Sequence, residues 1–262
     1  MPDDFSPSAS IPSKAELRDV RALQQKKGRN EQHRFLVEGL KSVDELLLSD
    51  WPVAAVYATA EAMPVLQGQA NARGIRCYEV NASVLASLGT LVSNDQAIAV
   101  AMMRPMHRIN WAATSRVLAL DHIADPGNLG TLLRLADWYG IDVVLCSPNC
   151  VDRYNPKVVS ASMGSFLRVP VAVGSLPEAF AEAKSAQLAL MGAVLSGDNV
   201  HAASTTMAPG VLVIGSESHG LSMDVEALLT QRLTIPRFGQ AESLNAAVAC
   251  GILLDHWCRR LT

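Results

Sequence analysis

The sequence lacks the features of several protein classes. No apolar run approaches the roughly 18 residues that a membrane span needs. Residues 1–12 are rich in Ser, Pro and Asp and lack the basic and apolar regions of a secretory signal. The five cysteines are odd in number and form no CxxC pair, which disfavours a disulfide framework or a zinc site. We therefore expect a soluble, cytoplasmic protein with a flexible tail over residues 1–12.

Several common catalytic signatures are also missing. The chain contains no GxGxxG or GxxxxGK[ST] sequence, which disfavours dinucleotide and P-loop nucleotide sites. It contains no GxSxG nucleophile elbow, and its six histidines have no metal-ligand spacing. A nucleotide-dependent oxidoreductase is thus disfavoured, and no metal site is expected.

The charge balance gives no overall sign of nucleic-acid binding. The formal net charge is −3, whereas nucleic-acid-binding proteins are often basic. Seven basic residues nevertheless gather in residues 14–34 against three acidic ones: Lys14, Arg18, Arg21, Lys26, Lys27, Arg29 and Arg34. This segment is either a solvated helix face or a local contact for an anionic partner.

The 262 residues, with 49% hydrophobic and 18% charged residues, are typical of globular domains. In the first half, Ser13 and Glu16 predict a capping box at a helix start. Further helices are expected over 43–48 and 60–72, and strands over 35–37, 53–57, 75–80 and 97–103. The pattern predicts a small α/β domain over residues 13–106, followed by a linker over 107–114.

The second half, residues 115–262, alternates more regularly. Apolar strands are expected over 117–120, 143–146, 169–173, 188–194, 211–214 and 233–235. Helices are expected over 129–138, from Pro156, over 177–186 and over 243–258. Near-continuous apolar strands between helices predict a parallel sheet covered on both faces.

Three polar stretches follow strands of this sheet: Asp125–Gly130 with Arg134 beyond it, Gly215–Leu221, and Ile235–Ala249. Since parallel sheets bind ligands at the carboxyl ends of their strands, the three loops predict one shared site. Each residue taken alone has a plainer explanation. Arg134 could pair with Asp137, Glu217 could cap a helix, and Ser243 could be the N-cap of the last helix.

Together and in this order, the three stretches resemble the motifs of the SpoU (TrmH-like) branch of the SPOUT RNA methyltransferases. The resemblance covers about residues 117–258 and includes the connecting segment Asn155–Ser165. It implies a deep trefoil knot that forms a pocket for S-adenosylmethionine (SAM), and a homodimer through the knotted domain. The implied product is a 2'-O-methylated ribose in RNA.

The resemblance also assigns residues. Arg134 matches the family's catalytic arginine, and Asn128, Glu217, Ser243 and Asn245 match its supporting polar positions. The expected cofactor contacts are Gly215, Ile235, Leu244, Leu212, Ile214 and Ser243. Because arginine hardly deprotonates, positioning a phosphate and the ribose is an easier task for Arg134 than acting as a base. No metal is needed, because the sulfonium is already a good leaving group.

Three positions depart from the family pattern. Ser216 stands where Asn is usual, Arg237 where Met is common, and Ser160 where Arg is frequent. The first two border the expected pocket and put its detailed shape in question, and the third bears on RNA contact. None removes the residues that carry the implied chemistry.

The first half resembles the family's L30e-like substrate-binding domain, on the segment Arg34–Gly39 and the basic residues before it. This resemblance favours ribosomal RNA as substrate, with transfer RNA as the alternative. The expected RNA contacts are Arg18, Lys26, Lys27, Arg29 and Arg34, made chiefly to phosphates. An RNA-binding protein of the same fold without turnover is the alternative function.

Overall fold

The computed structural model describes residues 11–91, 96–202 and 207–259. Most of the tail expected over residues 1–12 therefore lies outside the described residues. Within them, no helix combines the length and apolar character that crossing a membrane requires.

Contacts divide the chain into two compact units. The first is Met1–Arg104 with Tyr154–Ser160, and the second is Pro105–Arg153 with Ala161–Thr262. The short segment Tyr154–Ser160 thus groups with the first unit although it follows the second unit's first strands. The phenol ring of Tyr154 stacks 4.5 Å, centroid to centroid, from the ring of Phe35.

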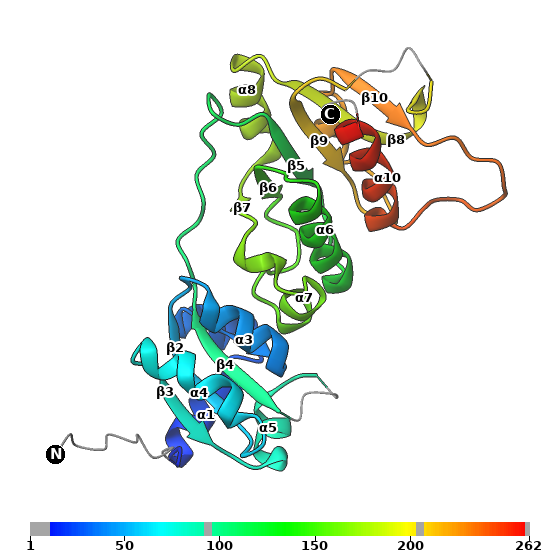
Figure 1. Cartoon of the computed structure of the whole chain (residues 1–262). Coiled ribbons are helices and arrows are strands. Elements are labelled where there is room, and N and C mark those ends of the chain that lie inside the picture. Colours follow the sequence, from blue (N-terminus) through cyan, green and yellow to red (C-terminus); the bar gives the residue numbers. More distant parts are fainter. Residues whose placement is uncertain (1–10, 92–95, 203–206, 260–262) are drawn as a thin grey trace. The chain divides into compact units, whose positions relative to one another are not determined.

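The first unit is built on a four-stranded mixed sheet with the strand order β1-β4-β2-β3 (Figure 1). Its strands are β1 (Arg34–Glu38), β2 (Val53–Ala58), β3 (Arg76–Glu79) and β4 (Ala97–Met102). The helices are α1 (Lys14–Ala22), α2 (Lys26–Gln32), α3 (Leu40–Leu48), α4 (Met63–Ala72) and α5 (Ala82–Leu88). The expected capping box is confirmed, because the Ser13 hydroxyl accepts from Glu16 N at 3.2 Å and Glu16 Oε2 accepts from Ser13 N at 2.8 Å.

The second unit contains a six-stranded sheet of order β10-β8-β9-β5-β6-β7, and every pairing is parallel. Its strands are β5 (Arg116–Leu120), β6 (Val143–Cys146), β7 (Val171–Val173), β8 (Ala189–Asn199), β9 (Gly210–Ile214) and β10 (Gln231–Thr234). The helices are α6 (Pro126–Trp138), α7 (Pro156–Ala161), a 3-10 turn (Ser165–Leu167), α8 (Leu176–Ser185), α9 (Met223–Glu226) and α10 (Ala246–Arg259). The predicted parallel α/β fold is confirmed.

Helices cover both faces of the six-stranded sheet. Phe180 and Leu176 of α8 and Val225 of α9 pack on one face, in a core with Val117 and Val211. Residues alternate along a strand, so the neighbouring side chains of β5 and β9 point to the opposite face. There α6 and α10 lie side by side (Figure 1). The topological switch lies between β5 and β9, and sheets of this kind commonly bind ligands beyond the carboxyl ends of strands near such a point.

Several predicted boundaries are wrong. The last helix begins at Ala246 rather than at Ser243, and α6 begins at Pro126 because Asp125 caps it. α5, capped by Asn81, was not predicted, since seven residues are too few for a clear apolar period. The knot stays a prediction.

The capping box of α1 gives a prediction about pH. The Tyr78 hydroxyl and the Ser13 backbone amide donate to Glu16 and lower the pKa of its carboxyl from 4.5 to about 2. The ionised carboxylate therefore stabilises the folded state above about pH 4.5, and this stability is lost as the pH falls toward 2. Glu16→Gln should lower the thermal midpoint at pH 7.

The difference in thermal midpoint between wild type and Glu16→Gln should become smaller as the pH falls from about 5 to about 3. Thermal melts at several pH values measure this difference. Tyr78→Phe removes the largest cause of the lowered pKa of Glu16. In a Tyr78→Phe background, Glu16→Gln should therefore lower the thermal midpoint by less than it does in the wild type. A difference in midpoint that does not change with pH would contradict this account.

Candidate active site

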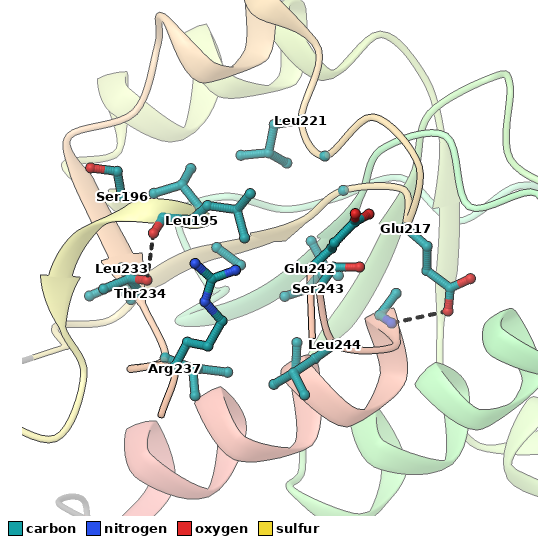
Figure 2. Close-up of a pocket in the computed structure, with 18 of the residues that line it drawn as sticks. Leu195, Ser196, Glu217, Leu221, Leu233, Thr234, Arg237, Glu242, Ser243 and Leu244 are labelled. Carbon is teal, nitrogen blue, oxygen red and sulfur yellow. Dashed lines mark hydrogen bonds between the residues drawn. The ribbon is translucent and has the colours of Figure 1, made fainter. Parts of the chain in front are cut away.

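A cavity of about 1070 Å³ opens in the second unit at the carboxyl ends of β9 and β10 (Figure 2). Its wall is formed by residues 193–196 of β8, the loop 214–221, and the segment 233–244 that leads toward α10. The volume compares with the roughly 300–1,000 Å³ of small-molecule pockets. The sequence pattern predicted the second and third segments but not the first, because residues 193–196 lie at the end of an expected apolar strand.

The predicted cofactor residues mostly lie on this cavity. Gly215, Ile214, Ile235, Ser243 and Leu244 all line it. Leu212 does not, because it is fully buried inside β9, two residues before the strand reaches the cavity. The assignment of Leu212 as a cofactor contact is therefore corrected.

The charged residues of the cavity favour a positively charged ligand. Three carboxylates, Glu217, Glu226 and Glu242, line the wall with Arg237. Because Glu226 is paired with Arg232 at 3.5 Å, an excess of one negative charge remains in the cavity. Figure 2 shows the Arg237 side chain directed into the cavity, and its Nη1 donates to the Ala241 carbonyl at 3.2 Å. An apolar floor that includes Leu221, Leu233 and Leu253 completes a site that fits an aromatic base joined to a cationic group.

The loop after β9 closes on itself. The backbone amides of Ser216 and Gly220 each donate to the other's carbonyl, at 3.0 and 2.9 Å. A Cβ on Gly215 would lie 2.2 Å from the Gly220 carbonyl carbon, so no larger residue fits without opening the loop. Ser216, which departs from the family pattern, accepts a hydrogen bond from His219 N at 3.2 Å and so supports the same closed form.

Glu217 joins all three predicted loops. Its Oε1 accepts from Asn128 Nδ2 at 2.9 Å, from Ala246 N at 3.3 Å and from Asn245 Nδ2. Asn245 Nδ2 also lies 2.9 Å from Asn128 Oδ1. The predicted residues Asn128, Glu217 and Asn245 are thus brought together. Among the described residues, no group donates to Glu217 Oε2, so this oxygen is available to a ligand.

The side chain that caps the last helix differs from the one considered in the sequence. The Asn245 side chain, not that of Ser243, caps α10, because Asn245 Oδ1 accepts from Ala247 N at 3.0 Å and Val248 N at 3.3 Å. The interpretation of Ser243 as the N-cap is wrong. Its hydroxyl lines the cavity instead, without a hydrogen-bond partner in the part of the chain that the structure describes.

Arg134 is exposed on α6 and does not line the cavity. The alternative of an ion pair with Asp137 is not formed, because that carboxylate accepts from Arg168 Nη2 at 2.8 Å and from Ser165 Oγ at 2.8 Å. Within the described ranges the guanidinium of Arg134 has no partner. An exposed arginine without a protein partner is suited to binding an incoming anion.

Four of the five basic residues predicted to contact RNA are exposed in the first unit: Arg18, Lys26, Lys27 and Arg34. Arg29 is 2% exposed, and its Nη1 donates to the carbonyls of Leu23 and Gln24, each at 3.0 Å. The guanidinium is therefore used in holding the turn between α1 and α2. The assignment of Arg29 as an RNA contact is corrected.

No cluster of three or more His, Cys, Asp or Glu side chains suited to a metal ion occurs in residues 11–91, 96–202 and 207–259.

Comparison with known proteins gives two family matches. Residues 115–255 match the SpoU rRNA Methylase family, and residues 14–99 match the MRM3-like substrate binding domain. These matches correspond to the two halves of the predicted resemblance and, apart from residues 154–160, to the two units.

Individual relatives span nearly the whole chain. The chain is 30% identical to the 23S rRNA (guanosine(2553)-2'-O)-methyltransferase RlmP of Bacillus subtilis, over 92% of this chain and 94% of that protein. It is 33% identical to an uncharacterised tRNA/rRNA methyltransferase of Synechocystis, over 91% and 88%. The AdoMet-bound rRNA methyltransferase of Sinorhizobium meliloti superposes with a TM-score of 0.83 at 28% identity, over 97% of this chain and 98% of the other.

The closed loop after β9 gives a stability prediction. Gly215→Ala should lower the free energy of unfolding by about 1–3 kcal/mol, because the added methyl meets backbone that must move. Gly239→Ala is the matched control in the same cavity wall, since nothing lies within 4 Å of the point where its new methyl group would sit. Urea unfolding should separate the two, and equal stabilities would contradict the close packing at Gly215.

Proposed function

Because the chain belongs to the SpoU rRNA methylase family, we propose that it transfers a methyl group from S-adenosylmethionine to a ribose 2'-hydroxyl of ribosomal RNA. The observation that carries the proposal is the Glu217 cluster at the mouth of an acidic cavity, where polar groups from three loops converge. Transfer RNA is the alternative substrate, since one relative is named for both RNAs.

The residues that line the cavity suit SAM. Its purine would lie on the apolar floor, against the backbone of Gly215, Ile235 and Leu244. The excess of carboxylates favours the sulfonium, and Arg237 offers a partner for the carboxylate of the methionine part. When bound, SAM supplies a methyl group on a sulfonium, which is a good leaving group.

The protein's task is then to present the 2'-hydroxyl. Glu217 Oε1 already accepts three hydrogen bonds, whereas Oε2 accepts none from the described residues. Oε2 can therefore accept the hydroxyl proton in a hydrogen bond and polarise the hydroxyl oxygen. The Ser243 hydroxyl adds a second polar contact. Arg134 would hold the adjacent phosphate bidentately and so orient the ribose, and Glu217 Oε2 would take the proton that the 2'-oxygen loses when it is methylated.

A homodimer through the second unit is part of this proposal. The layer of α6 and α10 leaves apolar side chains in solvent, with Trp138 83% and Val248 53% exposed. Exposed aromatic and aliphatic side chains on one helical layer are compatible with a subunit interface. We also propose that the second unit contains the trefoil knot. A cytoplasmic location, where the protein would encounter ribosomal RNA, is part of the same proposal.

Arg134→Ala should leave the Kd for SAM within about threefold and reduce methyl transfer by about 100-fold or more, because a misplaced ribose forfeits the aligned geometry. Single-turnover transfer to RNA and calorimetric titration of SAM measure the two effects. Arg259→Ala removes another exposed arginine of the same unit, which pairs with Asp255, and should change neither. Unchanged transfer by Arg134→Ala would remove Arg134 from the mechanism.

Replacing Arg18, Lys26, Lys27 and Arg34 together with Ala should weaken RNA binding and flatten its salt dependence, by about 0.7–0.9 in logarithmic slope for each phosphate that the protein no longer neutralises. Lys41→Ala with Lys184→Ala controls for charge removed elsewhere. Filter binding at several salt concentrations measures the slope. An unaltered salt slope would show that these four residues are solvated surface and make no RNA contact. Arg29→Ala, in contrast, should destabilise the fold.

A further inference from the structure

A buried carboxylate lies beside the candidate site and is not used by the mechanism above. Asp121 directly follows β5 and is 1% exposed. Its Oδ2 accepts from Ser222 N at 2.8 Å and from Ser222 Oγ at 2.7 Å, and its Oδ1 lies 2.6 Å from His122 Nδ1. Burying a carboxylate is costly unless it is fully hydrogen-bonded, so these contacts hold their donors firmly in place.

Asp121 holds both ends of the loop that carries Glu217. At the first end, the Asp121 amide donates to the Ile214 carbonyl at 2.9 Å. At the far end, the Asp121 carboxylate binds Ser222, the residue after Leu221. Between these points the loop is closed by its own Ser216–Gly220 backbone pair. The loop therefore has its own internal shape, and Asp121 sets its position.

Asp121 also begins the segment that leads into α6, the helix that carries Asn128. His122, the next residue, has φ of 57°, a left-handed conformation that a non-glycine residue rarely adopts. Three contacts hold it there: Nδ1 with Asp121, Nε2 with Asn149 Nδ2 at 2.8 Å, and its amide with Ser147 Oγ at 3.0 Å. A neutral imidazole protonated on Nδ1 satisfies both ring contacts.

We propose that Asp121 is a positioning residue for methyl transfer. It fixes the loop of Glu217 relative to the helix of Asn128, across the switch point between β9 and β5, and so sets the contact between those two side chains. Asp121 itself touches neither the cavity nor the cluster; it acts through Ser222 and His122. This inference rests on the proposed function.

The chain offers a matched control for the test. Asp142 accepts from Ser115 N at 2.8 Å, from Ser115 Oγ at 3.1 Å and from Arg116 N at 2.9 Å. It thus binds the same kinds of donor, including a serine amide and hydroxyl, at the opposite, amino end of β5. Asp142 is exposed whereas Asp121 is buried, so Asp121→Asn should cost more stability, and kcat measured on fully folded protein separates that loss from a change in the site.

The experiment measures thermal stability and kcat for methyl transfer to RNA in both variants, at a temperature where both are folded. Both should lose stability, but only Asp121→Asn should lower kcat, by about tenfold or more, while Asp142→Asn stays within about twofold of wild type. Ser222→Ala and Ser115→Ala form a milder pair with the same expected contrast, should Asp121→Asn fail to fold.

A double-mutant cycle adds a second readout. If Asp121 acts through Glu217, adding Asp121→Asn to Glu217→Gln should lower kcat by much less than it does alone. Equal kcat values in the two matched variants, or fully multiplicative effects in the cycle, would overturn the inference while wild-type transfer stands. Absence of transfer by the wild type would overturn the proposed function, and the inference with it.

Discussion

The hydrogen bonds to Glu217 Oε1 are the constraint on which the candidate site depends. They join the start of α6 through Asn128, the loop after β9 through Glu217 itself, and the start of α10 through Asn245 and Ala246. Residues 128, 217 and 245 are far apart in sequence, so only the folded sheet brings them together. One carboxylate oxygen is consumed in assembling the site, and the other is left for a ligand.

The proposed chemistry follows from the different surroundings of the two carboxylate oxygens of Glu217. An acidic cavity with an apolar floor suits a cationic nucleoside, and Glu217, which lines it, has one carboxylate oxygen that accepts no hydrogen bond from the described residues. The exposed Arg134 has no partner within the described residues, which leaves it available for a phosphate. The proposed mechanism thus gives binding, orientation and polarisation to different side chains. Asp121, behind the site, connects the two loops whose side chains must meet.

The sequence predicted much of this arrangement, for identifiable reasons. Apolar strands between helices specified the parallel sheet, and polar stretches after three of its strands specified the place of the site. Helix capping was less well predicted, since Ser243 and Asn245 are both good caps and only the structure shows that Asn245 is used. The burial of Arg29 and the bridging by Asp121 were not predictable, because both depend on contacts between segments that no local pattern encodes.

The most direct test of the account is transfer of a radiolabelled methyl group from SAM to RNA from a strain lacking this gene, with ribosomal and transfer RNA separated and the labelled nucleotide mapped. The account predicts label on a ribose 2'-oxygen of ribosomal RNA. Label on a base would contradict the proposed chemistry, and label confined to transfer RNA would contradict the proposed substrate. Absence of both SAM binding and label would contradict the assignment of the cavity as a cofactor site.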